Sequence, residues 1–421
     1  MRLQLGVVWS LAASCVPSPA HPPPERASAQ TAEATASAAP VPSASATAIA
    51  VPAKATTVDP TVRTTVVDHE PDIEDIAVGG DDIVWPRMSR RGIEIIKVSK
   101  RELRAPADVR QIPHRLHGMI GSSDALDDIA ASAAGVLVQR QFSPDGEQVH
   151  HRAELLTAGA EPTLLAEDVA GIAADPSGWY WITEAAMTTV PTPPGMIASA
   201  TVGGKPVPAT LTMMQQQAPE RVFRLPPGET VPTCLGDAPG AAGAFGTTLA
   251  LGGRYVAFPS FRRGDEHPAP EIVWVAKSSA ADRKTAACRK WNELGLGIPV
   301  FAADDADGFL AGYQAGRTTV LRCPSVGKDC TVIGSFDGAL SLPLVLAGER
   351  LFYALAEGKA TGGGEDRVVI FRMPRSGGPP EPVARVAGEV GDLAADGEFL
   401  YWTVPQKGIV ERIGLSRVDT D

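Results

Sequence analysis

A short phrase that recurs along the chain constrains its fold more than any other feature. The phrase runs from an acidic residue through a short apolar strand and a Gly/Asp turn to an aromatic-rich strand, most clearly in Asp75–Trp85, Gly171–Trp181 and Asp392–Trp402. Weaker copies begin near Asp128, Thr248, Val300 and Leu342. Seven copies at spacings of roughly 40 to 75 residues fit the period of a four-stranded propeller blade. We therefore predict an all-β fold, a β-propeller with seven blades, or with six if one weak copy is misread.

Further strands follow each copy of the phrase. A third strand ends in a basic residue and then a small residue or proline, as in Val222–Pro226, Val320–Pro324 and Val369–Pro374. A fourth strand follows in several copies, for example Pro162–Ala166 and Glu381–Arg385. These segments are short, rich in β-branched and aromatic residues, and bounded by Gly and Pro. The pattern predicts four antiparallel strands in each blade.

The two ends of the repeat region complement each other. The last copy stops after its third strand, near Val418, whereas Thr61–Val67 reads as a lone strand without a blade of its own. If this strand completes the final blade, the chain ends pair and no sheet edge stays open to aggregation. The sequence thus predicts a ring that is closed by its N- and C-terminal strands.

The last copy also carries a family resemblance. The segment Asp396–Thr403, followed after a short gap by Ile409–Leu415, is similar to the YWTD and NHL-like propeller repeats. The resemblance extends over about 350 residues and implies the propeller fold. Propellers of these families include enzymes, ligand-binding domains of receptors and scaffolds, so the resemblance does not select one function.

The N-terminus reads as an export signal, residues 1–15. Arg2 supplies a positive charge, and Leu3–Ala13 is apolar but too short to span a bilayer. The end of this segment, Leu11–Cys15, resembles the bacterial lipoprotein signal, which implies lipidation of Cys15. The alternative is ordinary cleavage further along, after Ala20 or Ala29.

The signal is followed by residues 16–60, which are nearly all Ala, Pro, Ser and Thr. Such a segment cannot bury enough apolar area to offset its chain entropy, so we expect a disordered tether. Residues 61–421 then form the propeller domain. This organisation predicts an exported, lipid-anchored protein of the outer membrane or cell envelope that faces the periplasm or the cell surface.

Four more cysteines allow two disulfides in an exported protein: Cys234, Cys288, Cys323 and Cys330. Cys323 and Cys330 have a spacing suited to bridging a hairpin, and the pair Cys234–Cys288 follows only by elimination. Four unpaired buried thiols are the alternative. Neither pair has the close double spacing of a zinc site. Cys15 is then the unpaired cysteine, as a lipid-bearing residue would be.

Acidic residues open most of the predicted inner strands and therefore approach the centre of the ring at one face: Asp75, Asp128, Asp168, Asp305 and Asp392. Converging carboxylates suit a hard cation such as Ca²⁺, and such a site would resemble that of the metal-dependent lactonase propellers. The alternative is structural, because an Asp before a strand commonly accepts hydrogen bonds from the backbone amides of its own turn. We expect no metal or cofactor unless these acids bind Ca²⁺.

Long insertions fall between the second and third strands of three blades, at Ala185–Pro219, Pro259–Pro270 and Ala356–Asp366. In a four-stranded blade this position lies at the same face as the connections between blades. Insertions confined to one face commonly mark a binding surface, although tolerated loop growth would look the same.

The net charge of the chain and its lack of known catalytic motifs limit the classes of function that we consider. The net charge of −11 argues against nucleic acid as a partner, because no basic surface is available to displace phosphate counterions. The chain has no Gly-x-Ser-x-Gly, no His-Glu-x-x-His and no phosphate-binding glycine loop, and hence no candidate catalytic residue. The leading hypothesis is a monomeric module that binds a protein or glycan through the face with the insertions. The alternatives are a metal-dependent lactonase-type hydrolase and a scaffold of an envelope complex.

Overall fold

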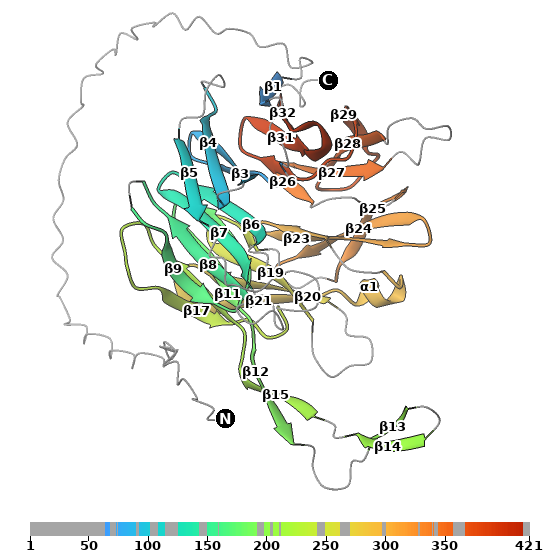
Figure 1. Cartoon of the computed structure of the whole chain (residues 1–421). Helices are drawn as coiled ribbons and strands as arrows, with labels where there is room; N and C mark the ends of the chain where they lie inside the picture. The colour runs from blue at the N-terminus through green and yellow to red at the C-terminus, as the bar shows by residue number, and fades with distance from the viewer. Residues whose placement is uncertain are drawn as a thin grey trace, which may run out of the picture. The chain divides into compact units, whose positions relative to one another are not determined.

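A computed structural model of the protein describes residues 64–67, 73, 75–89, 92–101, 108–113, 125–142, 150–158, 160–191, 198–202, 205–209, 212–241, 249–261, 270–296, 300–326, 329–338, 340, 344–356 and 367–415. These residues form a ring of antiparallel sheets with almost no helix (Figure 1). The predicted signal with Cys15 and the predicted tether lie outside the described residues.

Seven four-stranded sheets make the seven blades. The strands of blades 1 and 2 are β2 (Ala77–Gly79), β3 (Asp82–Ser89), β4 (Gly92–Ser99), β5 (Asp108–Pro113), β6 (Ala125–Ser132), β7 (Gly135–Phe142), β8 (His150–Leu156) and β9 (Thr163–Glu167). Those of blades 3 and 4 are β10 (Val169–Asp175), β11 (Gly178–Thr183), β16 (Arg221–Leu225), β17 (Thr233–Asp237), β18 (Ala250–Leu251), β19 (Tyr255–Phe261), β20 (Pro270–Ala276) and β21 (Ser279–Ala287).

The remaining blades follow the same order. The strands of blades 5 and 6 are β22 (Val300–Ala303), β23 (Asp307–Gln314), β24 (Arg317–Pro324), β25 (Thr331–Asp337), β26 (Val345–Ala347), β27 (Arg350–Ala356), β28 (Arg367–Pro374) and β29 (Glu381–Ala387). Those of blade 7 are β30 (Leu393–Ala395), β31 (Phe399–Val404), β32 (Ile409–Gly414) and β1 (Thr64–Val67). The helical elements described are α1 (Arg289–Glu293) and one 3₁₀ turn (Pro405–Lys407). The all-β, seven-blade prediction is confirmed.

The chain ends close the ring as the sequence predicts. Strand β1 pairs antiparallel with β32, with Thr65 opposite Glu411 and Val67 opposite Val410. The inner strands also contact one another all the way round, in the order β2, β6, β10, β18, β22, β26, β30 and back to β2. Blade 7 is therefore built from both ends of the domain.

The core of the molecule lies between the blades. Seven clusters of buried apolar side chains are present, one at each junction between neighbouring blades. The aromatic residues of the repeat supply much of this core, because Trp85, Trp181, Trp274 and Trp402 are all completely buried. A single blade cannot bury both of its faces, so each depends on its neighbours for its hydrophobic stabilisation.

The ring has two faces with different loops. At one face, here called the inter-blade face, the chain passes from blade to blade and from the second to the third strand within a blade. At the other, here called the turn face, lie the turns from first to second and from third to fourth strand. The large insertion of blade 3 leaves the inter-blade face between β11 and β16. It contains the hairpins β12 (Ala186–Pro191) with β15 (Thr212–Ala218) and β13 (Ala198–Val202) with β14 (Lys205–Ala209).

Candidate functional site

Three of the five predicted acids occupy one equivalent position in neighbouring blades. Asp75, Asp128 and Asp392 each precede the first core residue of an inner strand, at the inter-blade face. In each of these blades the acid lies four residues before the first residue of the turn that joins the inner strand to the second strand. The other four copies of the repeat carry no carboxylate at this position, where they have Gly171, Thr248, Val300 and Pro343. We call Asp75, Asp128 and Asp392 the carboxylate triad.

Backbone amides hold two of these carboxylates in place. Asp392 Oδ1 accepts a hydrogen bond of 2.7 Å from the N–H of Leu393, and its Oδ2 accepts one of 3.1 Å from the N–H of Ile76 in blade 1. Asp128 Oδ1 accepts a bond of 2.8 Å from the N–H of Ile129. The predicted structural role of these acids is thus present, and for Asp392 it also links the last blade to the first.

The triad is electrostatically coupled. Burial, followed by the negative charge of Asp75, raises the pKa of Asp128 to about 7, although the amide of Ile129 opposes the shift. Burial also raises the pKa of Asp392 well above its ordinary value, and the charges of Asp75 and Asp128 add to this effect against the opposing amide of Ile76. Like charges that share a poorly solvated site disfavour one another's ionisation. At neutral pH the triad therefore resists carrying its full negative charge.

Two histidines extend the acidic region from the triad towards blade 3. His151 lies between two acids, with Nε2 3.2 Å from Asp127 Oδ2 and Nδ1 3.1 Å from Glu184 Oε1. Burial raises the pKa of Asp127, whereas His151 lowers it. His150 Nδ1 lies 3.1 Å from Asp168 Oδ1. We call six acids at the inter-blade face of blades 7, 1, 2 and 3 the acidic face: Asp75, Asp127, Asp128, Asp168, Glu184 and Asp392.

Glu184 had no signal in the sequence pattern, because it follows the second strand of blade 3 and opens no inner strand. Only the pairing of β10 with β11 brings it to the inter-blade face. Its backbone N–H donates to the carbonyl of Asp168, which has a positive φ of 54°. Glu184 therefore lies where the blade 3 insertion begins, directly after β11 and two residues before β12.

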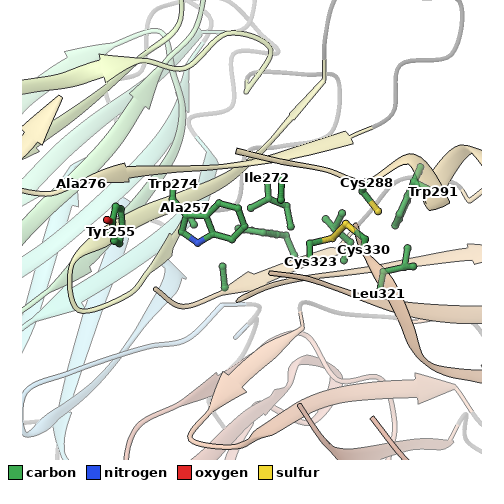
Figure 2. Close-up of a cluster of buried hydrophobic side chains, with 14 residues drawn as sticks. Tyr255, Ala257, Ile272, Trp274, Ala276, Cys288, Trp291, Leu321, Cys323 and Cys330 are labelled. Atoms are coloured by element: carbon green, nitrogen blue, oxygen red, sulfur yellow. A yellow bond between two sulfur atoms is a disulfide. The ribbon is translucent and has the colours of Figure 1, made fainter. Parts of the chain in front are cut away.

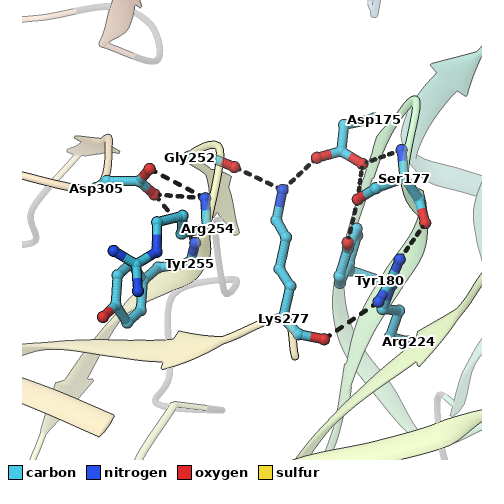
Figure 3. A network of polar contacts seen from close by, with 9 residues as sticks. All are labelled: Asp175, Ser177, Tyr180, Arg224, Gly252, Arg254, Tyr255, Lys277 and Asp305. Atoms are coloured by element: carbon cyan, nitrogen blue, oxygen red, sulfur yellow. Dashed lines mark hydrogen bonds and ion pairs between the residues drawn. The ribbon is translucent and has the colours of Figure 1, made fainter. Parts of the chain in front are cut away.

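Asp305 does not belong with the other acids, and its predicted place at the same face is wrong. Strand β22 ends at Ala303, so Asp305 follows the inner strand and lies in the first turn of blade 5, at the turn face. Its carboxylate accepts hydrogen bonds from the N–H groups of Arg254 and Tyr255 in blade 4, at 2.9–3.0 Å (Figure 3). It joins two blades at the end opposite to the triad.

A second polar network at the turn face joins blades 3 and 4 (Figure 3). Lys277, which follows β20, contacts the carboxylate of Asp175 and donates a 2.5 Å hydrogen bond to the carbonyl of Gly252. Arg224 donates to the carbonyl of Ser177 at 2.7 Å and to that of Lys277 at 3.2 Å. These contacts connect residues of two neighbouring blades, and we call such a connection a clamp.

The same clamp recurs at two other junctions. Lys100 of blade 1 lies 2.7 Å from Asp396 of blade 7, and Arg375 of blade 6 lies 2.8 Å from Asp304 of blade 5. In each case a cation after a third strand reaches an acid after the preceding blade's inner strand. Arg322, near the end of a third strand, adds a contact of 2.8 Å to Asp307. The Arg322 contact lies within blade 5, whereas the cations that directly follow the third strands hold neighbouring blades together.

The cysteines pair only in part as predicted. Cys323 and Cys330 form a disulfide with an S–S distance of 2.00 Å. The pairing of Cys234 with Cys288 is wrong, because Cys288 carries a free, buried thiol. Cys288 lies instead at the junction of blades 4 and 5, where it packs in the core with Cys323 and Cys330. Pairing the two remaining cysteines by elimination could not predict this arrangement, because a count of cysteines does not show where the blades place each sulfur atom.

Comparison with known proteins adds little to the site. No protein-family model and no curated protein matches the chain. Solved structures match at low identity, among them phage phi92 endosialidase, which is 9% identical with a TM-score of 0.45 over 86% of this chain and 70% of that one. A prolyl endopeptidase is 12% identical with a TM-score of 0.44 over 80% of this chain. BamB from Moraxella catarrhalis is 13% identical with a TM-score of 0.39 over 84% of this chain and 100% of its own.

This chain spans about half the length of the prolyl endopeptidase, 48% of which is covered. The blade count rests on the chain's own strand pairing, and these distant likenesses add no function to it. In the part of the chain that the structure describes, no helix is long and apolar enough to cross a membrane.

Proposed function

We propose that this protein is a binding module that holds a protein partner on its acidic face, through a basic segment of that partner. The observation that carries the proposal is the carboxylate triad at equivalent positions of blades 7, 1 and 2. Burial is the largest cause of the raised pKa of Asp128 and Asp392, and the charges of neighbouring acids add to it. An ammonium or guanidinium group supplied by a partner would relieve the repulsion that raises these pKa values.

The surroundings of the triad support the same function. Asp127, Asp168 and Glu184 extend the acceptor surface towards the blade 3 insertion, which offers further contact area at the same face. The net charge of −11 would also steer a basic partner towards the molecule and speed its association. Carboxylates without a nucleophile motif suit recognition better than covalent catalysis.

The N-terminal signal extends the proposal to location. We propose that the chain is exported and anchored by a lipid on Cys15, as a monomer that presents its acidic face to the periplasm or the cell surface. Support comes from the apolar Leu3–Ala13 and the small residues before Cys15. Intact-mass measurement tests this directly. A mature chain that starts at Cys15 with added acyl mass is expected, and an unlipidated chain that starts after Ala20 or Ala29 would contradict the anchor.

A matched pair of triple variants tests the binding site. One replaces Asp75, Asp128 and Asp392 by Asn; the other replaces Glu229, Glu349 and Glu398 by Gln. The second set is exposed in turns of the opposite face, so both variants change the net charge equally. Binding of a fluorescent Lys/Arg-rich peptide at physiological ionic strength is expected to weaken about tenfold or more in the first variant and little in the second. Equal affinities of the two variants would show that only net charge matters, which contradicts the proposed site.

A second candidate function is a metal-dependent lactonase-type hydrolase, for which the triad would have to close around an ion, because among the described residues three such ligand atoms lie within 4.8 Å of one another only in a cluster of cysteines. Carboxylate oxygens suit Ca²⁺, and each oxygen that accepts a backbone N–H keeps a second lone pair. Asp75, Asp128 and Asp392 would hold the ion, which would polarise the lactone carbonyl. Equilibrium dialysis with Ca²⁺, thermal unfolding and lactone hydrolysis test this function. Stoichiometric Ca²⁺, a raised melting temperature and turnover that the Asn variant loses would support it, and no retained Ca²⁺ would exclude it.

A further inference from the structure

Three sulfur atoms from two blades meet in the core between blades 4 and 5 (Figure 2). Cys288 follows β21 of blade 4, whereas in blade 5 Cys323 lies one residue before the end of β24 and Cys330 precedes β25. The three Sγ atoms all lie within 4.8 Å of one another, and all three residues are buried. Neither the repeat nor the acidic face accounts for this cluster.

The backbone and the core around the sulfurs hold them in place. The N–H of Cys288 donates to the carbonyl of Pro270 at 2.9 Å, and its own carbonyl accepts from the N–H of Trp291 at 3.1 Å. Ile272, Trp291 and Leu321 pack around the cluster. The position of each sulfur is thus determined by strands and by the short helix α1, which is the kind of rigid support a metal site requires.

We propose that, when the Cys323–Cys330 disulfide is reduced, the three cysteines form a binding site for one soft metal ion of the Cu(I) class. Two thiolates on one ion with metal–sulfur bonds of about 2.3 Å are at most about 4.6 Å apart, close to the limit of 4.8 Å within which these sulfurs already lie. An all-sulfur donor set selects soft ions over Ca²⁺ and Mg²⁺. Structural zinc almost always takes four protein ligands, whereas this group in the described chain offers three.

The disulfide makes the site dependent on redox state. Reduction breaks the S–S bond of Cys323 and Cys330 with two electrons and two protons from a dithiol, which becomes a cyclic disulfide. Binding of the ion then releases thiol protons to solvent. Affinity for the ion should therefore increase with pH, and the oxidised protein should lack the site.

Anaerobic titration with Cu(I) against a chromophoric chelator, combined with X-ray absorption, tests the inference. The protein reduced with a phosphine is expected to hold one Cu(I) with three sulfur neighbours. The Cys288→Ser variant should show two sulfurs and at least about tenfold weaker binding. The oxidised protein should lack this three-sulfur centre.

Two results would overturn the proposal. One is a reduced wild-type protein that takes up no Cu(I), or binds it with two sulfurs. The other is a Cys288→Ser variant with the sulfur count and affinity of the wild type. The sulfur count in the wild-type protein decides the question even if the variant fails to fold. The acidic face plays no part in these measurements, so its own test stands or falls separately.

Discussion

The backbone N–H of Ile76 in blade 1 donates a 3.1 Å hydrogen bond to Asp392 Oδ2 in blade 7, across 316 positions of sequence. The same carboxylate belongs to the triad of the acidic face. Ring closure and the candidate site therefore share one residue, at the junction where the first and last blades meet. The pairing of β1 with β32 joins the two chain ends within blade 7, at its outer strand. The hydrogen bond of Asp392 joins blade 7 to blade 1 beside their inner strands.

Asp392→Ala should destabilise the ring more than Asp392→Asn. The Ala variant leaves the N–H groups of Ile76 and Leu393 without their side-chain acceptor, at a cost of about 1–3 kcal/mol in the free energy of unfolding. Both variants remove the charge of Asp392, but Asn keeps one carbonyl oxygen as an acceptor, so it should be the more stable of the two. Urea unfolding followed by tryptophan fluorescence measures both. Equal losses would mean that these hydrogen bonds do not stabilise the closure.

The stability of the protein should depend on pH through Asp128. Its pKa is about 7 in the folded state and near 3.8 as an unperturbed group, so the folded state holds a proton that the unfolded state has lost between these values. Stability from this group is present below pH 4 and is lost as pH rises towards 7. Asp128→Asn keeps the acceptor for Ile129 and removes the charge. Its unfolding free energy should exceed that of wild type by on the order of 1–3 kcal/mol above pH 7, and the gain should vanish near pH 4.

Unfolding curves of Asp128→Asn and wild type at a series of pH values check this directly. Two profiles that run parallel from pH 4 to pH 8 would show that Asp128 titrates normally. That result would contradict the electrostatic coupling of Asp128 to the other two acids of the triad.

Arg375→Ala should weaken the junction of blades 5 and 6. The guanidinium lies 2.7 Å from Asp307, which is only 3% exposed, so the variant leaves a buried carboxylate with Arg322 as its remaining cation. We expect a loss of about 2–4 kcal/mol in the free energy of unfolding. The control is Arg101→Ala, whose 3.6 Å pair with Asp81 has side chains 82% and 76% exposed. That variant should change stability by less than about 0.5 kcal/mol, and similar losses in both would refute the clamp.

The pKa of Asp307 gives the Arg375 variant a second signature. Burial alone would raise this pKa, but hydrogen bonds and charge from Arg322 and Arg375 lower it overall. A lowered folded-state pKa contributes stability above the ordinary value near 3.8 that is lost as pH falls below it. In Arg375→Ala the free energy of unfolding should therefore fall less steeply than in wild type as pH decreases below that value. The same dependence on pH in the variant and the wild type would contradict the proposed pairing of Arg375 with Asp307.

Removal of β1 should open the ring. A chain that starts at residue 69 leaves β32 as an exposed edge strand and removes the buried Val66 from its core cluster. A chain that starts at residue 60 keeps β1 and is the control. The shorter chain should aggregate and lose cooperative unfolding, because an open edge pairs with other chains. Analytical ultracentrifugation and thermal unfolding compare the two, and a monomeric, cooperative shorter chain would show that β1 is dispensable.

Much of the fold could be predicted from the sequence because all seven blades have the same physical requirement, and the corresponding sequence pattern recurs seven times. Trp85, Trp181 and Trp402 occur in phase because each blade must bury its second strand against a neighbour. The lone strand before the first copy and the missing strand after the last defined the closure. These are local patterns, which short segments reveal without knowledge of the tertiary structure.

The site was harder to predict, because it depends on which end of a strand a residue occupies. The pattern of acids beside inner strands groups Asp305 with Asp75, yet Asp305 follows its inner strand as Asp396 does. A shift of one strand length moves a side chain to the opposite face. Glu184 lies beside His151 only through contact between neighbouring blades. The free thiol of Cys288 likewise follows from packing between blades, which a count of cysteines cannot capture.

The carboxyl titration of Asp128, followed by NMR with selectively ¹³C-labelled aspartate in wild type and Asp75→Asn, tests the account most directly. Burial, with the added charge of Asp75, predicts a pKa of about 7 for Asp128 in the wild type, and a lower pKa when the charge of Asp75 is removed, still above the ordinary value because burial remains. A wild-type Asp128 that titrates near 3.8, or a pKa that Asp75→Asn leaves unchanged, would show that these carboxylates are not coupled.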